Sequence, residues 1–171
     1  MFVTHNLEDA LVLGDQLIII DEGKVLQVGE KEEVFTRPNS IQTAKLLGMK
    51  NFIHGKVISQ NTKEGVSFLD WGGKQLVVPW QENSKSGQKA SYGIRAENIS
   101  LVSPEDTIRE RNNLFTAGIQ DVIPSFIGYR LILSFEHTRG EMEMLVSSPA
   151  YHQYVAGKGE IQIAFDPCFL C

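Results

Sequence analysis

The sequence has few cysteines, no long apolar run and no excess of basic residues. Only two of its 171 residues are cysteines, so a framework of several disulfides is excluded. No apolar run approaches the roughly 20 residues that cross a bilayer. The formal net charge of −5 disfavours a protein that binds nucleic acid through its phosphates. With 42% hydrophobic and 22% charged residues, the composition predicts a globular protein of the cytoplasm.

The two cysteines, Cys168 and Cys171, are spaced as a CxxC pair. This spacing allows a redox pair or half a zinc site. The alternative is that both thiols pack as small apolar groups at the end of a last strand. No second CxxC completes a four-sulfur site, and His54, His137 and His152 are too scattered to be metal ligands. We therefore predict no metal site.

The first fifty residues show mixed α/β patterning. The apolar spacing of Leu7–Leu13 predicts a helix, with Asn6 as its N-cap and Gly14 as its stop. Two β-branched runs, 16–20 and 25–29, flank a turn and predict a hairpin. Two further short helices are expected over 31–36 and from Ser40 to 47.

Alternating or β-branched stretches recur from residue 51 onward, separated by turn signals. Strands of this length and spacing favour small closed or half-closed barrels, because closure removes exposed sheet edges. The expected strands are Lys56–Ser59, Val66–Leu69, Gln75–Val78, Ile99–Val102, Gly118–Val122, Tyr129–Phe135, Glu141–Val146 and Glu160–Phe165. The expected turns are Trp71–Lys74, Ser84–Gly87, Thr138–Gly140 and Ala156–Gly159.

A short internal repeat supports two barrels, because Asn51–Val57 is echoed by Asn113–Ile119 ahead of a strand, a turn and a strand. The predicted fold class is α+β and mainly β. A short α/β segment over 1–48 precedes antiparallel β-barrel lobes of OB-fold type over 49–171, with the lobes at 51–103 and 108–171.

Two motifs resemble a known family. Residues 2–29, from Phe2-Val3-Thr4-His5 to Gly29, are similar to the switch-histidine region of the import ATPases of ABC transporters. Tyr92–Leu101 resembles the "GIRPE-I-L" signature of the transport-associated OB (TOBE) domain that follows the ATPase domain, with Ala96 in place of the usual proline. Because the motifs occur in the family's order, the segment over 1–48 is identified as the end of a nucleotide-binding domain and 49–171 as a TOBE domain.

The resemblance implies that His5 is the switch histidine, which senses the γ-phosphate of ATP in the intact subunit. ATP and magnesium would belong to that full-length parent. The sequence contains no G-x-x-x-x-G-K-S/T loop and no apolar strand that ends in Asp-Glu. We therefore expect no enzyme activity and no cofactor in this chain, and expect the chain to be a piece of a longer subunit.

The resemblance also implies a ligand. Ile108–Phe115 looks like a degenerate form of the segment that holds a tetrahedral oxyanion in molybdate- and tungstate-binding domains, with Arg111 and Asn112 as its ligand residues. Lys50 and Asn51, ahead of the other repeat, would form a second half-site. The alternative is that the arginines pair with neighbouring acidic residues in a solvated turn.

The leading hypothesis is a regulatory and dimerisation region of an importer's ATP-binding subunit, which senses a transported oxyanion such as molybdate, tungstate or sulfate. Its partners would be a second copy of the subunit and, through the parent ATPase domain, the permease subunits at the inner face of the membrane. One alternative is the same region of a sugar or polyamine importer, which acts only in dimerisation or regulator binding. Others are an OB-fold nucleic-acid binder, which the negative charge disfavours, and an independent enzyme, for which no assembled nucleophile and base are visible.

Overall fold

The structure, a computed structural model, describes residues 2–82, 84–103 and 113–171. The chain divides into two compact units, one of residues 1–49 with Cys171 and the other of residues 50–170. No helix in the described part of the chain combines the length and the apolar character needed to cross a membrane. Each unit is held by a core of its own.

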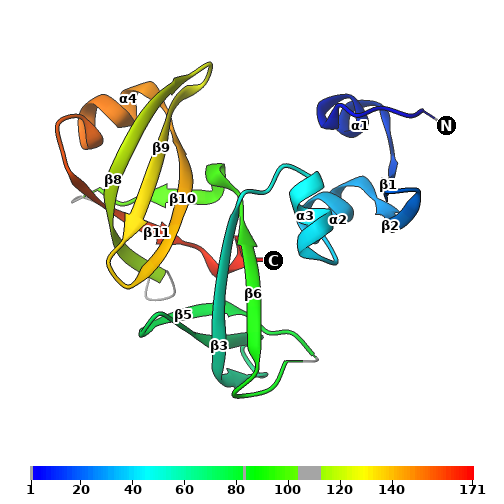
Figure 1. The fold of residues 1–171 in the computed structure, drawn as a ribbon, viewed down its shortest axis with the longest axis horizontal. Coiled ribbons are helices and arrows are strands. Elements are labelled where there is room, and N and C mark those ends of the chain that lie inside the picture. The colour runs from blue at the N-terminus through cyan, green and yellow to red at the C-terminus, as the bar shows by residue number, and fades with distance from the viewer. Residues whose placement is uncertain (1, 83, 104–112) are drawn as a thin grey trace. The chain divides into compact units, whose positions relative to one another are not determined.

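The first unit contains three short helices and a hairpin (Figure 1). Its elements are α1 (Leu7–Leu13), β1 (Gln16–Asp21), β2 (Lys24–Glu30), α2 (Lys31–Thr36) and α3 (Ile41–Leu46). Local capping explains where the helices begin: Asn6 Oδ1 accepts the Glu8 N–H at 2.9 Å, and Ser40 Oγ accepts the Thr43 N–H at 3.1 Å. The helix, hairpin and cap predictions for this segment are confirmed.

The core of the first unit is small, built on Leu17, Val34 and Leu47. Four apolar side chains of the hairpin are instead more than half exposed, at 52–60%: Ile18, Ile20, Val25 and Val28. A hairpin with this much exposed aliphatic surface is typical of an element that packs against a further layer.

The second unit consists of two antiparallel sheets. The first has the strand order β5-β4-β3-β6 and the second β10-β9-β8-β11-β7. The strands are β3 (Asn51–Asn61), β4 (Val66–Trp71), β5 (Lys74–Pro79), β6 (Lys89–Ile94), β7 (Ile99–Leu101), β8 (Asn113–Ser125), β9 (Gly128–Phe135), β10 (Thr138–Val146) and β11 (Glu160–Phe165). Short helical turns are η1 (Ala96–Asn98), α4 (Ser148–Ala150), η2 (Tyr151–Val155) and η3 (Pro167–Phe169).

The two sheets repeat one design. The order β5-β4-β3-β6 matches β10-β9-β8-β11 strand for strand. Asn51 opens β3 opposite Ile94, and Asn113 opens β8 opposite Phe165. Both opening strands also carry a register shift at the same place, after Val57 in β3 and after Ile119 in β8. We name residues 51–98 the first repeat and residues 113–169 the second repeat.

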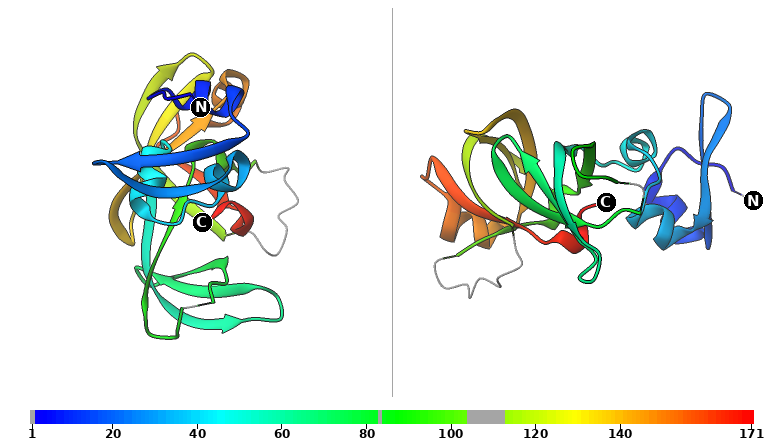
Figure 2. Two further views of the ribbon diagram at one scale, coloured as in Figure 1. Left: turned by 90° about the vertical axis from the view of Figure 1, so that its right-hand side faces the viewer. Right: turned by 90° about the horizontal axis from the view of Figure 1, so that it is seen from below.

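The repeats share one core, and the strand between them, β7, joins the sheet of the second repeat. β7 follows the first repeat in the chain but pairs with β11 of the second, with Ile99 opposite Phe165. The buried side chains of both sheets form a single apolar cluster, which includes Ile53, Leu69, Tyr92, Leu133, Met144 and Ile163. Both views of Figure 2 show β3 (teal) beside β6 (green), the pair that begins with Asn51 opposite Ile94.

The sequence patterns did not predict the short helical turns of this unit, and they failed for one strand and one turn. Lys89–Ile94 was not predicted as a strand, because it contains a glycine and only one β-branched residue; pairing with β3 and the burial of its last three residues stabilise it. The predicted turn at Thr138–Gly140 is wrong. These residues belong to β10, which is irregular between Thr138 and Glu141, and Glu136 and His137 form the turn.

Candidate functional site

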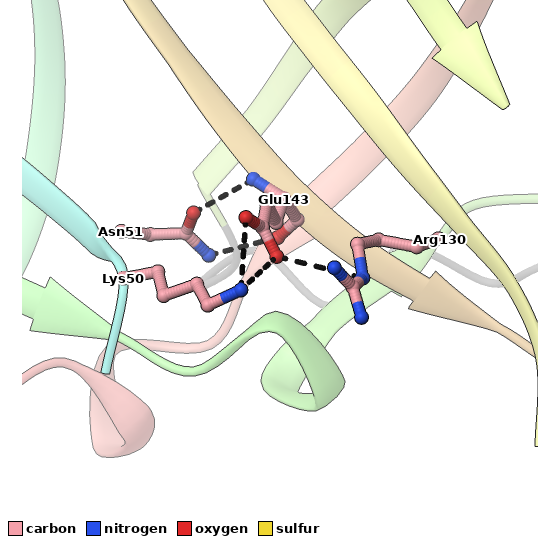
Figure 3. A network of polar contacts seen from close by, with 4 residues as sticks. All are labelled: Lys50, Asn51, Arg130 and Glu143. Carbon is pink, nitrogen blue, oxygen red and sulfur yellow. Dashed lines mark hydrogen bonds and ion pairs between the residues drawn. The ribbon is translucent and has the colours of Figure 1, made fainter. Parts of the chain in front are cut away.

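Two of the predicted oxyanion residues, Lys50 and Asn51, lie at the start of β3 and contact Glu143 of β10 (Figure 3). The other two, Arg111 and Asn112, lie outside the described residues. The predicted switch histidine, His5, is an exposed residue just ahead of α1. Of the four predicted ligand residues, the structure therefore describes Lys50 and Asn51 and places both beside Glu143. All four stay predictions.

Asn51 joins the first repeat to the second. Its side-chain Nδ2 donates to the carbonyl oxygen of Glu143 at 2.8 Å, and its Oδ1 accepts the Glu143 N–H at 2.7 Å. The amide thus pairs with β10 as another strand would. Since Asn51 is only 2% exposed, these bonds satisfy polar groups that water does not reach.

Asn113 makes the same contact in the opposite direction. Its Nδ2 donates to the carbonyl oxygen of Val77 in β5 at 2.8 Å, and its Oδ1 accepts the Val77 N–H at 2.6 Å. A further bond runs from Nδ2 to the carbonyl oxygen of Phe165 at 3.1 Å. Each repeat therefore opens with an asparagine that pairs with the third strand of the other repeat. We call these contacts the reciprocal asparagine clamps.

The carboxylate of Glu143 lies between two cations beside the Asn51 clamp. Lys50 Nζ is 3.2 Å from Oε1 and 3.1 Å from Oε2, and Arg130 Nε is 3.6 Å from Oε2. The side chain of Lys50 is 56% exposed and that of Glu143 25%. We call Lys50, Asn51, Arg130 and Glu143 the Glu143 network; Glu143 itself takes the position of an anion between two cations.

The Glu143 network combines two cationic side chains with one carboxylate. Two cations and one carboxylate leave it with one excess positive charge. The Asn51 side chain is committed to backbone groups, so an external anion would bond to Lys50 and Arg130 in competition with Glu143.

The turns of the two β-hairpins β4–β5 and β9–β10 meet in an aromatic cluster. Trp71 lies with its ring centroid 4.5 Å from that of His137 and 5.0 Å from that of Phe135. The Nε2 atom of His137 is buried without a hydrogen-bond partner. Burial, reinforced by Lys74 and opposed by Glu136, lowers the pKa of His137 from its ordinary 6.5. The imidazole is therefore held in its neutral form, in which it packs as an aromatic ring.

Cys168, the first cysteine of the CxxC pair, is not activated. A hydrogen bond with Asp166 raises the pKa of the exposed Cys168 thiol, which leaves less of it as the reactive thiolate. Within the described ranges, no group of three or more His, Cys, Asp and Glu residues is arranged to hold a metal ion.

The sequence resembles import ATP-binding proteins over about two thirds of its length. WtpC of Thermococcus kodakarensis, a molybdate/tungstate import ATP-binding protein, is 34% identical over 120 residues, which are 70% of this chain and 33% of WtpC. PotA of Fusobacterium nucleatum, a spermidine/putrescine import ATP-binding protein, is 30% identical over 119 residues, 70% of this chain and 31% of PotA. Its relatives are ATP-binding subunits of ABC importers. The resemblance to the ABC import ATPases is thereby confirmed.

These importer relatives differ in what their names say they carry. AglK of Rhizobium meliloti, an alpha-glucoside transport ATP-binding protein, is 28% identical over 113 residues, 64% of this chain and 31% of AglK. The chain spans about a third of the length of these curated relatives. No protein-family model matches the chain.

A solved structure shares the fold. The crystal structure of the cytoplasmic molybdate-binding protein ModG, with molybdate bound, superposes with a TM-score of 0.59 over 72% of this chain and 94% of that chain. The sequence identity is 14%, so this likeness concerns the fold alone. With the antiparallel sheets, it confirms the predicted fold class, α+β and mainly β with OB-like lobes.

Sequence reasoning missed three residues that shape this site. Glu143 and Arg130 lie on strands far along the chain from Lys50, and no local pattern pairs them. Asn113 was visible only as the first residue of the repeated segment. Its position relative to Asn51 was the one signal that both asparagines serve the same purpose.

Proposed function

We propose that this chain is the C-terminal regulatory and dimerisation region of the ATP-binding subunit of an ABC importer. The observation that carries the proposal is the 34% identity to WtpC over 70% of the chain, combined with the two-repeat fold. In the intact subunit, an ATPase domain would bind ATP and magnesium, and His5 would contact the γ-phosphate. That domain would in turn dock on permease subunits at the cytoplasmic face of the membrane.

The first unit fits the end of such an ATPase domain. Its hairpin exposes Ile18, Ile20, Val25 and Val28, which would be covered if further layers of the domain packed on them. His5 is exposed beside the N-terminus of α1, where a nucleotide bound by the rest of the subunit could reach it.

The second unit would then act as a sensor for a transported oxyanion such as molybdate, tungstate or sulfate. An oxyanion would bind Lys50 and Arg130 in place of the Glu143 carboxylate, and Arg111 and Asn112 would contribute the second half-site. Binding would favour one arrangement of the paired subunits over another and thereby adjust the rate of ATP hydrolysis. Import would slow when the substrate is plentiful inside the cell.

The test is calorimetric titration of the purified chain with molybdate, tungstate, sulfate and phosphate. We expect saturable binding of one oxyanion that is lost in Lys50→Gln and in Arg111→Ala. Lys63→Gln, which removes an exposed lysine from the β3–β4 loop, is the matched control and should bind as the wild type does. Absence of binding by all four anions would reject the sensor function.

A second candidate is the same region of a polyamine importer, favoured by the 30% identity to PotA over 70% of the chain. Spermidine is a cation and would not depend on Lys50. Two results together would assign the chain to this class instead. Spermidine would bind saturably to both the wild type and Lys50→Gln, and none of the four oxyanions would bind.

A further inference from the structure

The hairpin β8–β9 ends in an exposed apolar loop. Ser125 pairs with Gly128, so Phe126 and Ile127 alone form the turn. Phe126 is fully exposed and Ile127 is 72% exposed. Two-residue hairpin loops favour asparagine, aspartate and glycine, so the local turn does not explain two large apolar residues. We call Phe126 and Ile127 the apolar tip, which lies at the end of the long β8–β9 hairpin in Figure 1.

The corresponding loop of the first repeat is polar. Between Asn61 and Val66 it contains Thr62, Lys63, Glu64 and Gly65. Since the two hairpins share their topology and their bulge, the fold itself does not require an apolar tip. The apolar tip is therefore specific to the second repeat and is not a requirement of the shared fold.

The first repeat carries an apolar pocket that could receive such a tip. Its cavity of about 460 Å³ has a floor of Val66 and Phe68 of β4 and Val77 and Pro79 of β5. Its rim is completed by Glu64 and Gly65 of the β3–β4 loop and, from the second repeat, by Asp166, Pro167 and Cys168. The four strand residues are half-buried and face the cavity from one side of the sheet. We call this cavity the β4–β5 pocket.

On the described strands of the second repeat, two charged side chains occupy the equivalent surface. The strand registers place Arg130 where Val66 lies and Glu143 where Val77 lies. Glu143 pairs with both Arg130 and Lys50. Among the described residues, the second repeat thus combines an apolar tip with a charged strand surface, and the first combines a polar tip with the β4–β5 pocket.

We infer that the apolar tip of one copy of this chain inserts into the β4–β5 pocket of a second copy. This inference rests on the proposed dimerisation function and identifies its contact surface. A two-fold axis would satisfy both contacts at once and close the pair. Such a dimer leaves neither apolar surface exposed.

The area is sufficient for a stable dimer. Two aromatic rings bury roughly 300–500 Å² together. The walls of the two pockets bury a comparable area, and the two Ile127 side chains add to it. The sum reaches the ~1,000 Å² at which specific interfaces begin. An aromatic side chain seated in a pocket is also the arrangement in which single residues dominate binding.

The experiment measures the mass of the chain by sedimentation velocity from low to high micromolar concentration. We expect a dimer for the wild type and at least a ~10-fold weaker dimer for Phe126→Ser. The backbone at Phe126 and Ile127 has negative φ angles, so serine fits without strain. Lys63→Ser, at the polar tip of the first repeat, is the matched control and should remain dimeric.

A pocket variant makes the test specific. Val77→Glu places a carboxylate in the β4–β5 pocket, at a position where the second repeat already holds Glu143. It should be monomeric when alone, and unfolding curves would verify that it is folded. Mixing Val77→Glu with Phe126→Ser should restore a heterodimer, because the intact tip of the first variant meets the intact pocket of the second.

Three results would overturn the inference: a wild-type chain that stays monomeric, a dimer that both variants leave unchanged, or a mixture that associates no more strongly than either variant alone. Co-sedimentation of a monomeric wild type with phosphatidylglycerol vesicles would assign the apolar tip to a lipid surface instead. Anion titration and mass are separate readouts. A dimer that depends on the tip but binds no oxyanion would reject only the sensor function.

Discussion

The two repeats of the second unit share a backbone design and differ in the side chains at their surfaces. Both open with a buried asparagine, carry the same bulge and order their strands alike. The first repeat has a polar tip and an open apolar pocket, whereas the second has an apolar tip and a charged network. The asparagine positions preserve the fold, and the tips and strand faces are free to take different functions.

The clamps should be the most sensitive contacts. Asn113→Ala removes three hydrogen bonds and leaves the half-buried N–H and C=O of Val77 without these partners, so we expect a loss of about 3–5 kcal/mol in the free energy of unfolding. Asn51→Ala removes two bonds and should cost about 2–4 kcal/mol. Urea denaturation measures both. Gln120→Ala, at an exposed amide of β8, is the control, and equal effects in all three variants would contradict the clamps.

The second-largest difference in stability should come from replacing the glycine at the end of each tip loop with alanine. Gly128 has a φ of 141°, and a Cβ there would collide with the carbonyl of Val146, so Gly128→Ala should cost about 3 kcal/mol. Gly65 has a φ of 67° and open space around it, so Gly65→Ala should cost only about 1 kcal/mol. The two melting temperatures rank these effects. A reversed order would show that the second hairpin tolerates distortion better than the first.

The Glu143 network should contribute less to stability than to anion affinity. Glu143→Gln removes a partly exposed ion pair and should cost about 0.5–1 kcal/mol, less at high salt. The same change frees Lys50 and Arg130, so the oxyanion that binds the wild type should bind the variant more tightly. Calorimetry decides this point. Weaker binding by the variant would mean that Glu143 belongs to the site and does not compete with its ligand.

The smallest effect is a pH dependence from His137. Because burial lowers its pKa, the unfolded chain binds a proton more readily, and stability falls as the pH drops through about 6.5. Lys74 and Glu136 modulate this in opposite directions. Urea midpoints at pH 7.5, 6.5 and 5.5 should fall less steeply in His137→Gln than in the wild type. If His137→Gln falls as steeply as the wild type, His137 is not the titrating group.

The sequence predicted elements whose signals are local. Asn6, Gly14 and Ser40 cap or end their helices where expected, because a cap depends on residues within one turn. β6 escaped prediction because its stability comes from pairing with β3, and its own residues form strands weakly. The Glu143 network joins residues that the sequence separates widely, so only Lys50 and Asn51 could be named in advance. Arg111 and Asn112 remain predictions.

The reciprocal clamps have a consequence for how this unit folds. The third strand of each repeat satisfies part of its backbone through an asparagine of the other repeat, so a repeat by itself would leave Val77 or Glu143 without these partners. Neither half can reach its final structure before the other is present, and contacts such as Asn51 with Glu143 must span most of the unit. Such non-local contacts make folding slow and all-or-none. An isolated repeat would recover an asparagine partner for its third strand only by pairing with a second repeat. In this chain, that pairing occurs within one molecule.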